Sequence, residues 1–342
     1  MLALTLAACG GGGPPPEPTA TVTASSTPIP PPATATAEPS PTAVPTPDAT
    51  IEAEARCPDP YPGGAPYESE PGQPIRLQPL GTPPALVPFQ PMSFRRDAAL
   101  ESIVRTTLGR DDEHFAVYIK NLADGRGIRI DDERQFYAAS LFKTWVMLEA
   151  FHQRQAGLMD FAETYIVSDY YAALGLNPGE LSPCSEVSLN SAMHRMMATT
   201  DNVAANLLLE RAGAGNINLG IRTLGLEVSG FYQDDTLPTT AADMAHLLEA
   251  IVSGGAVDAA ASSEMLELLL SEVIDDRIPA RLPRGTQVAH KTGNWSTATH
   301  DAGIVFSPAA TYVIVLLTDY GFQDNGAAPI AALSRVVYDY YN

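Results

Sequence analysis

The distribution of proline most constrains what this chain can fold into. The sequence has 342 residues and 30 prolines, and 23 of these prolines lie in residues 1–91. Proline removes a backbone donor and is excluded from helix interiors and central strands, so residues 1–91 do not form an ordinary domain. The remainder, about 250 residues, is long enough to bury a sizeable core. We therefore predict one domain over residues 92–342.

The first residues indicate a protein that leaves the cytoplasm. Residues 1–9 form an apolar run that is too short for a membrane span, which takes about 20 residues, and the run ends in small residues as secretory signals do. Leu6-Ala7-Ala8-Cys9 resembles a bacterial lipobox, in which the cysteine is lipidated. The alternative is an ordinary signal peptide with a chance cysteine. No basic residue precedes the run, so we expect the true start to lie upstream.

A spacer follows this truncated signal. Residues 10–50 are mostly Gly, Pro, Thr, Ala and Ser, a composition that cannot bury enough surface to offset its ordering entropy. Residues 51–91 stay rich in proline but gain apolar residues, which predicts an irregular segment. We therefore interpret residues 10–91 as a tether followed by an irregular segment on the domain surface, and we expect an extracytoplasmic protein, lipid-anchored to a bacterial membrane or secreted.

Cysteine and histidine usage limits the kinds of site. If Cys9 carries lipid, Cys57 and Cys184 remain as a candidate disulfide in an oxidising compartment, with two free thiols as the alternative. The six histidines are scattered, and neither Cys-x-x-Cys nor His-Glu-x-x-His occurs. We therefore expect no metal site and no cofactor.

The charge balance argues against a nucleic-acid partner. The formal net charge is −20, and the acidic residues are spread along the chain as on a solvated surface. The chain holds 17 arginines but only three lysines, which are Lys120, Lys143 and Lys291. Because this chain otherwise uses arginine, a lysine on the surface is unexpected, and each lysine is a candidate for a special role. We expect a monomer.

The order of predicted elements defines a fold class. A helix over 98–107 precedes a hairpin over 115–130, whose turn is Asp124-Gly125. Helices follow, then strands, and a closing helix. The further predicted elements are a buried helix over 141–155, helices within 188–253 broken at 213–215 and 225–238, a helix over 262–270, strands over 288–290, 302–306 and 312–318, and a helix over 329–341. The two strand groups pair only if the chain returns to one sheet. This predicts an α/β fold, an antiparallel sheet flanked by helices with an inserted all-helical lobe.

The buried helix begins with a serine and a lysine three residues apart. Residues i and i+3 of a helix share a face, so Ser140 and Lys143 are expected to meet there. A serine hydroxyl needs a neighbouring base, and lysine serves as one only when burial or nearby positive charge lowers its pKa. The apolar residues around Lys143 favour burial. The alternative is an N-cap serine with a surface lysine.

Two more motifs follow. Thr200-Asp201-Asn202 precedes an apolar helix and is by itself typical of a helix N-cap. His290-Lys291-Thr292-Gly293-Asn294 lies on a predicted strand, where Lys291 and Thr292 offer a charge and a hydroxyl to a carboxylate. Gly293 leaves room for a ligand to approach the backbone.

Taken in order, Ser-x-x-Lys, a hydroxyl-Asp-Asn tripeptide and Lys-Thr-Gly are the motif set of penicillin-recognising serine enzymes. The separations of 60 residues from Ser140 to Thr200 and 91 from Thr200 to Lys291 agree with it. From about residue 95 to its end the chain resembles the class A β-lactamase family and the β-lactamase-like relatives of that family. The resemblance implies the β-lactamase or D,D-peptidase-like fold.

The resemblance also implies roles. Ser140 is then the acylated nucleophile, with Lys143 as its base or proton relay. Thr200 passes a proton to the leaving nitrogen, and Asn202 holds the substrate amide and contacts Lys143. The backbone N–H groups of Ser140 and Asn294 form the oxyanion hole.

The remaining roles concern the end of the substrate that carries the carboxylate. The resemblance implies that Lys291 and Thr292 bind a substrate carboxylate, next to Gly293 and Asn294. Arg277 is expected to help them, since some relatives carry an arginine five residues before the Leu-Pro turn. The alternative for Arg277 is a solvated surface arginine.

Two departures from the family pattern matter. Thr200 stands where serine is usual, and it keeps the hydroxyl. More seriously, class A β-lactamases carry a Glu-x-x-Leu-Asn loop whose glutamate activates the deacylating water, and no such motif occurs within 225–240. Asp234 and Asp235 are the substitute candidates, or else turn carboxylates.

We therefore expect a serine hydrolase that forms an acyl-enzyme through Ser140 with β-lactams or peptidoglycan-type D-alanyl peptides, with slow deacylation. The first alternative is a D,D-peptidase-like penicillin-binding enzyme. The second is a non-catalytic, cell-wall-anchored binding protein on the same fold. The retained serine, both motif lysines and Asn202 argue against the second.

Overall fold

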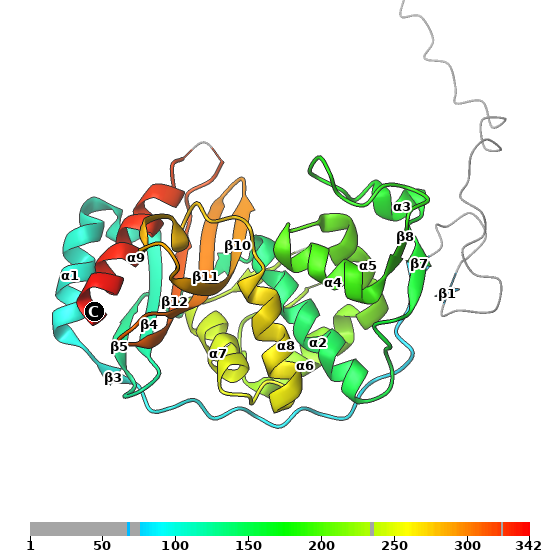
Figure 1. The fold of residues 1–342 in the computed structure, drawn as a ribbon, viewed down its shortest axis with the longest axis horizontal. Helices are drawn as coiled ribbons and strands as arrows, with labels where there is room; N and C mark the ends of the chain where they lie inside the picture. Colours follow the sequence, from blue (N-terminus) through cyan, green and yellow to red (C-terminus); the bar gives the residue numbers. More distant parts are fainter. Residues whose placement is uncertain (1–66, 69–75, 233–235, 323) are drawn as a thin grey trace, which may run out of the picture. The chain divides into compact units, whose positions relative to one another are not determined.

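The computed structural model describes residues 67–68, 76–232, 236–322 and 324–342 (Figure 1). The chain divides into two compact units, Met1–Glu54 and Ala55–Asn342, and all described residues belong to the second. The predictions for the lipobox, the tether up to residue 66, Cys57, Asp234 and Asp235 lie outside the described residues.

A six-stranded sheet forms the centre of the domain, in the order β10-β11-β12-β4-β5-β3. Neighbouring strands are antiparallel except β3 and β5, which are parallel. The bounds are β3 Arg95–Arg96, β4 Phe115–Asn121, β5 Arg126–Ile130, β10 Gln287–Trp295, β11 Ala298–Phe306 and β12 Thr311–Thr318. The pairing of β12 with β4 joins the last strands to the first ones, with Val315 opposite Tyr118. This confirms the predicted return of the chain to one sheet.

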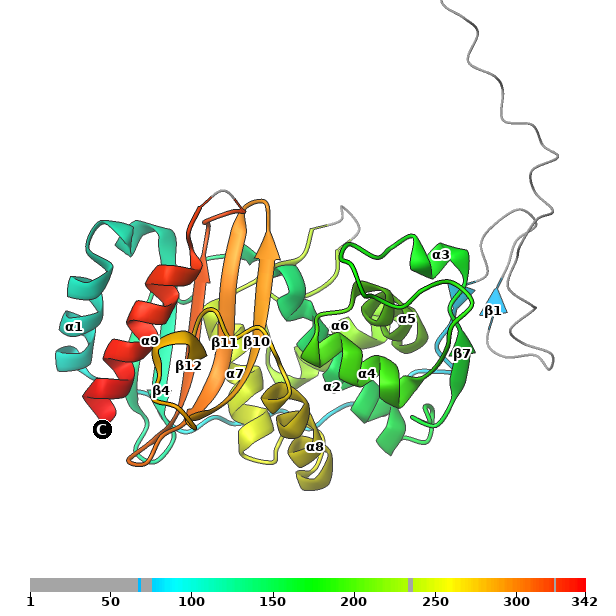
Figure 2. The same cartoon turned by 45° about the horizontal axis from the view of Figure 1, so that its top comes forward.

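Two helices from opposite ends of the domain 92–342 cover one face of the sheet (Figures 1 and 2). These are α1 (Ala98–Leu108) and α9 (Ala327–Tyr341). Their buried apolar residues pack with strand residues such as Ile119 and Ile314 in one hydrophobic cluster. Asp97 caps α1 by accepting a hydrogen bond from Leu100 N.

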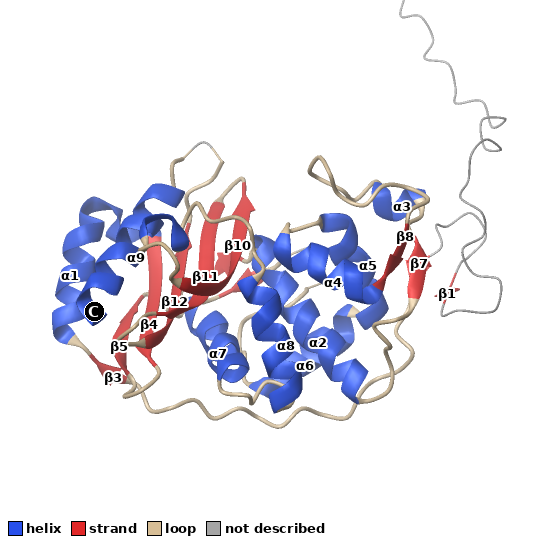
Figure 3. Ribbon diagram, in the orientation of Figure 1, coloured by secondary structure: helices blue, strands red, loops and turns tan. Residues whose placement is uncertain are grey.

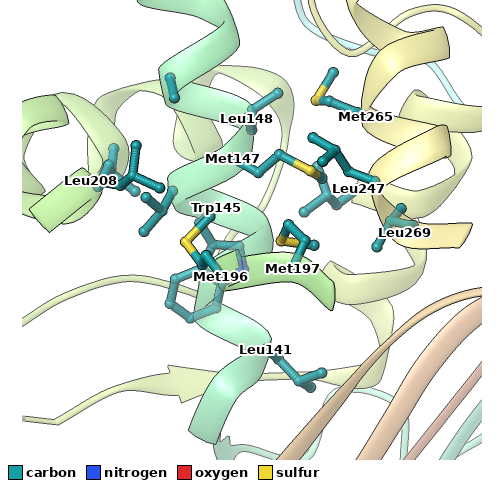
Figure 4. Close-up of a cluster of buried hydrophobic side chains, with 14 of the residues drawn as sticks. Leu141, Trp145, Met147, Leu148, Met196, Met197, Leu208, Leu247, Met265 and Leu269 are labelled. Atoms are coloured by element: carbon teal, nitrogen blue, oxygen red, sulfur yellow. The ribbon is translucent and has the colours of Figure 1, made fainter. Parts of the chain in front are cut away.

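The other face meets α7 and a lobe made mainly of helices (Figure 3). The longer helices are α2 Lys143–Gln155, α4 Leu189–Ala198, α5 Asn202–Ala212, α6 Ala214–Leu224, α7 Ala241–Val252 and α8 Ala259–Leu270. They share one hydrophobic cluster, in which Trp145 of α2 is fully buried among methionine and leucine side chains (Figure 4). This inserted lobe is the one that the sequence predicts.

Short elements complete the lobe and its junction with the sheet. They are β1 Tyr67–Glu68, β2 Arg76–Leu77, β6 Phe136–Tyr137, β7 Thr164–Ile166, α3 Asp169–Ala172, β8 Glu186–Ser188, β9 Pro238–Thr239 and the 3-10 turns Gly109–His114, Ala139–Phe142 and Pro279–Arg281. Within the described part of the chain, no helix is long and apolar enough to cross a membrane.

Two predicted boundaries are wrong in instructive ways. The helix predicted from residue 141 begins at Lys143, because the residues before it form the 3-10 turn Ala139–Phe142. The break predicted at 213–215 is confined to Gly213, whose φ of 84° lies in the left-handed region that favours glycine. Gly215 lies inside α6.

Candidate active site

Ser140 lies in the 3-10 turn between β6 and α2. The residue before it, Ala139, has a φ of 46°, a backbone conformation that non-glycine residues rarely adopt and that is concentrated at functional sites. Ser140 lines a cleft of about 610 Å³. Its described neighbours in the cleft wall are Tyr137, Ala139, Phe142, Leu174, Leu176, Asn177, Thr200, Asn202, Asn206, Ile274, Thr292, Asn294, Trp295 and Phe322.

Lys143 is fully buried and gives its hydrogen bonds to the Thr200-Asp201-Asn202 motif. Its Nζ donates to the Thr200 carbonyl at 2.7 Å, to Thr200 Oγ1 at 2.8 Å and to Asn202 Oδ1 at 2.9 Å. Burial lowers the pKa of the Lys143 ammonium to about 7, and the positive charge of Lys291 adds to this effect. No hydrogen bond joins Lys143 to Ser140 Oγ within the described residues, so Nζ is held against the opposite motif.

The first residues of α5 bring the second motif to this point. Asp201 is the N-cap, as predicted, and accepts from Ala204 N at 2.9 Å. Its other oxygen accepts from Arg195 Nε at 2.8 Å. Thr200 has a φ of 56°, which is unusual for a β-branched residue. The helix cap and the ion pair made by Asp201 therefore hold the neighbouring Thr200 in a strained conformation. In this conformation the carbonyl and the hydroxyl of Thr200 face Lys143.

Glu180 is a site residue that the sequence analysis missed. Its Oε1 accepts from Asn202 Nδ2 at 2.7 Å, and its Oε2 accepts from the backbone N–H of Leu176 at 2.9 Å. Glu180 therefore fixes the Asn202 amide and the loop that carries Leu176 into the cleft wall. No motif marks Glu180, because it lies 20 residues before Thr200 in an irregular loop.

Glu272 is the second missed residue. Its side chain is fully buried two residues after α8, where one carboxylate oxygen pairs with Lys291 Nζ and the other accepts from Thr292 Oγ1 at 3.0 Å. Burial lowers the pKa of Lys291, and Glu272 opposes that shift. The two groups expected to bind a substrate carboxylate are thus both engaged by a carboxylate of the protein itself.

Gly293 has a different role from the expected one. A Cβ at this position would lie 3.1 Å from the Ala138 carbonyl oxygen and 3.3 Å from Leu141 Cγ. The missing side chain therefore lets β10 approach the turn that carries Ser140. The glycine makes room for the protein's own backbone.

Arg277 is buried, at 2% exposure, so the surface alternative for this residue is wrong. Its Nη2 donates to Asn294 Oδ1 at 2.7 Å, and its Nη1 donates to the His300 carbonyl at 3.2 Å. Arg277 therefore fixes the Asn294 side chain at the cleft wall.

His300 anchors the segment before Ser140. Burial lowers its pKa to about 4, so the ring is neutral near pH 7. Its Nδ1 accepts from Thr318 N at 3.1 Å, which leaves Nε2–H to donate to the Tyr137 carbonyl at 2.9 Å. The ring thus connects β11, β12 and β6, and it escaped the sequence analysis because no motif contains it.

The remaining predictions concern metals and cysteines. Among the described residues, no group of three or more His, Cys, Asp or Glu is placed to hold a metal ion. Cys184 is disulfide-bonded, and its partner lies outside the described residues. The pairing with Cys57 stays a prediction.

Comparison with known proteins agrees with this geometry. A family model described as "Beta-lactamase enzyme family" matches residues 99–341. No curated protein matches the chain. Among solved structures, PBP-A is 24% identical, with a TM-score of 0.68 over 74% of this chain and 99% of that one. A β-lactamase of Sphaerobacter thermophilus is 22% identical, with a TM-score of 0.64 over 71% and 96%.

A β-lactamase of Chitinophaga pinensis is 20% identical, with a TM-score of 0.62 over 71% of this chain and 98% of that one. At these identities the structures show a shared fold, and the family model adds the sequence evidence. The order of the strands, the inserted lobe and the convergence of the three motifs on one cleft fit both. The chain is a β-lactamase-like serine hydrolase and belongs to the beta-lactamase enzyme family.

Proposed function

We propose that this protein forms an acyl-enzyme through Ser140 with β-lactams or D-alanyl-type peptides, and that it deacylates slowly. The observation that carries the proposal is the buried Lys143, whose pKa of about 7 supplies free amine three residues after the cleft-lining Ser140. A base with a pKa near the working pH is the most effective proton acceptor.

Acylation begins when Ser140 Oγ bonds to the substrate carbonyl carbon and its proton moves to Lys143 Nζ. The C–N bond then breaks, and the leaving nitrogen takes a proton through the Thr200 hydroxyl. Of the three oxygens that Lys143 contacts, only Thr200 Oγ1 carries a proton of its own, because the other two are carbonyl oxygens. Thr200 is therefore suited to relay the proton. Water must later cleave the Ser140 ester.

Slow deacylation has support from the cleft wall. Of the described residues that line the cleft, none is acidic. The only glutamate of 225–240 is Glu227, and it lines a different cavity with Thr240, Asp243 and Glu249. A positioned general base typically contributes about 10²–10⁴-fold, so its loss predicts a long-lived ester. A solved structure of PBP-A, its L158E mutant, is an acyl-enzyme complex with penicillin G.

Burst kinetics with a chromogenic cephalosporin test the two half-reactions. We expect a burst stoichiometric with the enzyme, slow turnover afterwards, and one adduct by intact mass that is absent in Ser140→Ala. An adduct that persists in Ser140→Ala would sink the nucleophile assignment. Rapid turnover without a burst, abolished by Asp234→Asn, would show instead that an aspartate replaces the usual glutamate.

We also propose that Cys9 carries a lipid that tethers the domain outside the cell. The support is the lipobox-like sequence followed at once by a proline-threonine spacer. Cys9→Ser, expressed with an intact upstream signal, should move the protein from the membrane fraction to the medium or periplasm. A variant that stays membrane-bound contradicts the tether.

A further inference from the structure

The contacts of Glu272 change what the cleft offers to a substrate. Lys291, Thr292 and Glu272 together are called the Lys291 subsite below, and Thr292 is the member that lines the cleft. The ammonium of Lys291 is paired with one oxygen of Glu272, and the other oxygen accepts from Thr292 Oγ1. The Glu272 and Lys291 side chains are both fully buried.

The hydroxyl of Thr292 has a single proton to give. A carboxylate oxygen only accepts hydrogen bonds, so in the contact with Glu272 the hydroxyl must be the donor. Thr292 Oγ1 then has only lone pairs left for a ligand in the cleft. A ligand carboxylate has no proton to offer these lone pairs, whereas an N–H or O–H group does.

The charges around the subsite also disfavour a ligand carboxylate. Arg277 Nε lies 3.4 Å from Asp276 Oδ1, so Arg277 also has an acidic partner. Lys291 and Arg277 therefore each have a carboxylate of the protein beside them. A ligand carboxylate is bound best by charge-assisted hydrogen bonds from cations, and here a carboxylate of the protein already lies beside these cations.

We propose that Glu272 is a specificity-determining residue that makes the Lys291 subsite prefer an uncharged hydrogen-bond donor over a carboxylate. The substrate class is then an acyl compound whose leaving group carries an amide N–H or a hydroxyl at this position. An example is a D-alanyl-type peptide that is cleaved at an interior peptide bond. The inference rests on the proposed acylation of Ser140 and departs from the carboxylate-binding role that the family resemblance implies for Lys291 and Thr292.

A matched pair of β-lactams tests it on the intact protein. Penicillin G and its primary carboxamide differ only at the group that the family resemblance places at the subsite. We expect the carboxamide to acylate Ser140 about five- to tenfold faster, because one hydrogen bond is gained and a repulsion is avoided. If the acid reacts as fast as the carboxamide or faster, the inference is wrong.

Glu272→Gln should reverse the preference. A glutamine Nε2 donates to Thr292 Oγ1, which frees the hydroxyl proton for a ligand carboxylate, and the substitution removes the negative charge of Glu272 from the subsite. The acid should then react about 10- to 100-fold faster than in the wild type, while the carboxamide changes little. An unchanged ratio of the two rates in a folded variant would contradict the role of Glu272.

A second buried Lys–Glu pair supplies the control. Glu249 pairs with Lys120 at 2.6 Å outside the cleft, and both side chains are buried. Glu249→Gln should lower the stability about as much as Glu272→Gln does. It should leave the ratio of the carboxamide rate to the acid rate as in the wild type, so the control separates an effect on stability from an effect on specificity. If Glu272→Gln fails to fold, the wild-type comparison of acid and carboxamide still decides. Failure of both compounds to modify Ser140 would count against the proposed function, whereas faster acid acylation counts only against this inference.

Discussion

At the scale of single residues, all three lysines of this chain are buried. What separates them is the charge of their partners. Lys120 and Lys291 each pair with a glutamate, whereas the hydrogen bonds of Lys143 go to three uncharged oxygens. Without a direct ion pair, burial of the Lys143 ammonium is poorly compensated, and its pKa falls to about 7. Burial lowers the pKa of Lys291 as well, so it is the position of Lys143, three residues after Ser140, that makes it the candidate base.

The pH dependence of acylation follows from this pKa. Below pH 7 Lys143 is protonated and cannot take the Ser140 proton, so the acylation rate should fall about tenfold per unit and reach a plateau above pH 8. Lys143→Arg should lose about 10²–10⁴-fold, as much as Lys143→Ala, because arginine does not deprotonate. Single-turnover acylation from pH 5 to 9 measures both. A flat profile, or near-normal acylation in Lys143→Arg, would mean that only positive charge is needed.

Glu180 tunes the same titration. Its negative charge raises the pKa of Lys143, against the larger effect of burial. Glu180→Gln keeps an oxygen for Asn202 and removes the charge, so the midpoint of the acylation profile should move to lower pH. Glu186→Gln, on an exposed side chain, should leave the midpoint in place. A midpoint that rises in Glu180→Gln would contradict the assigned sign.

At the scale of elements, the nucleophile depends on a short strand and a strained turn. β6 pairs with β9, and the Tyr137 carbonyl is held by the neutral ring of His300 on β11. Ala139, with its positive φ, then turns the chain so that Ser140 lines the cleft. The sheet therefore positions the turn that carries Ser140, and α2 begins only after this turn.

His300→Ala removes this anchor. It should lower the free energy of unfolding by about 2–4 kcal/mol, because two hydrogen bonds and a buried ring are lost, and it should slow acylation of Ser140. Thermal melting and single-turnover acylation measure the two effects. His194→Ala, on an exposed residue of α4, serves as the control. Wild-type acylation by a destabilised His300→Ala would limit the residue to a structural role.

At the scale of the whole molecule, a covalent link joins the lobe to another part of the chain. Cys184 is exposed, lies just before β8 and is disulfide-bonded. With Cys57 as its partner, the bond would fasten the middle of the segment 10–91 to the lobe, whether or not Cys9 carries a lipid.

Peptide mapping without reduction should therefore find Cys57 joined to Cys184. Cys57→Ser should lower stability by about 2–4 kcal/mol, since the cross-link restricts the unfolded chain, while Cys9→Ser should leave stability unchanged. Recovery of Cys57 as a free thiol, or of Cys184 joined to Cys9, would contradict the pairing.

The fold class, the inserted lobe and the members of the three motifs could be predicted from the sequence, because hydrophobic periodicity and helix caps are local properties of the chain and each motif is a short run of residues. The cap at Asp201, the burial of Lys143 and the strand Phe115–Asn121 follow from such local patterns. Glu180, Glu272 and His300 belong to no motif, and their partners lie 22, 20 and 163 residues away along the chain. These contacts form only when distant segments of the chain pack together. Long-range packing sets which charges and hydrogen bonds meet at a site, and that pairing determines the pKa of the base and the character of the Lys291 subsite.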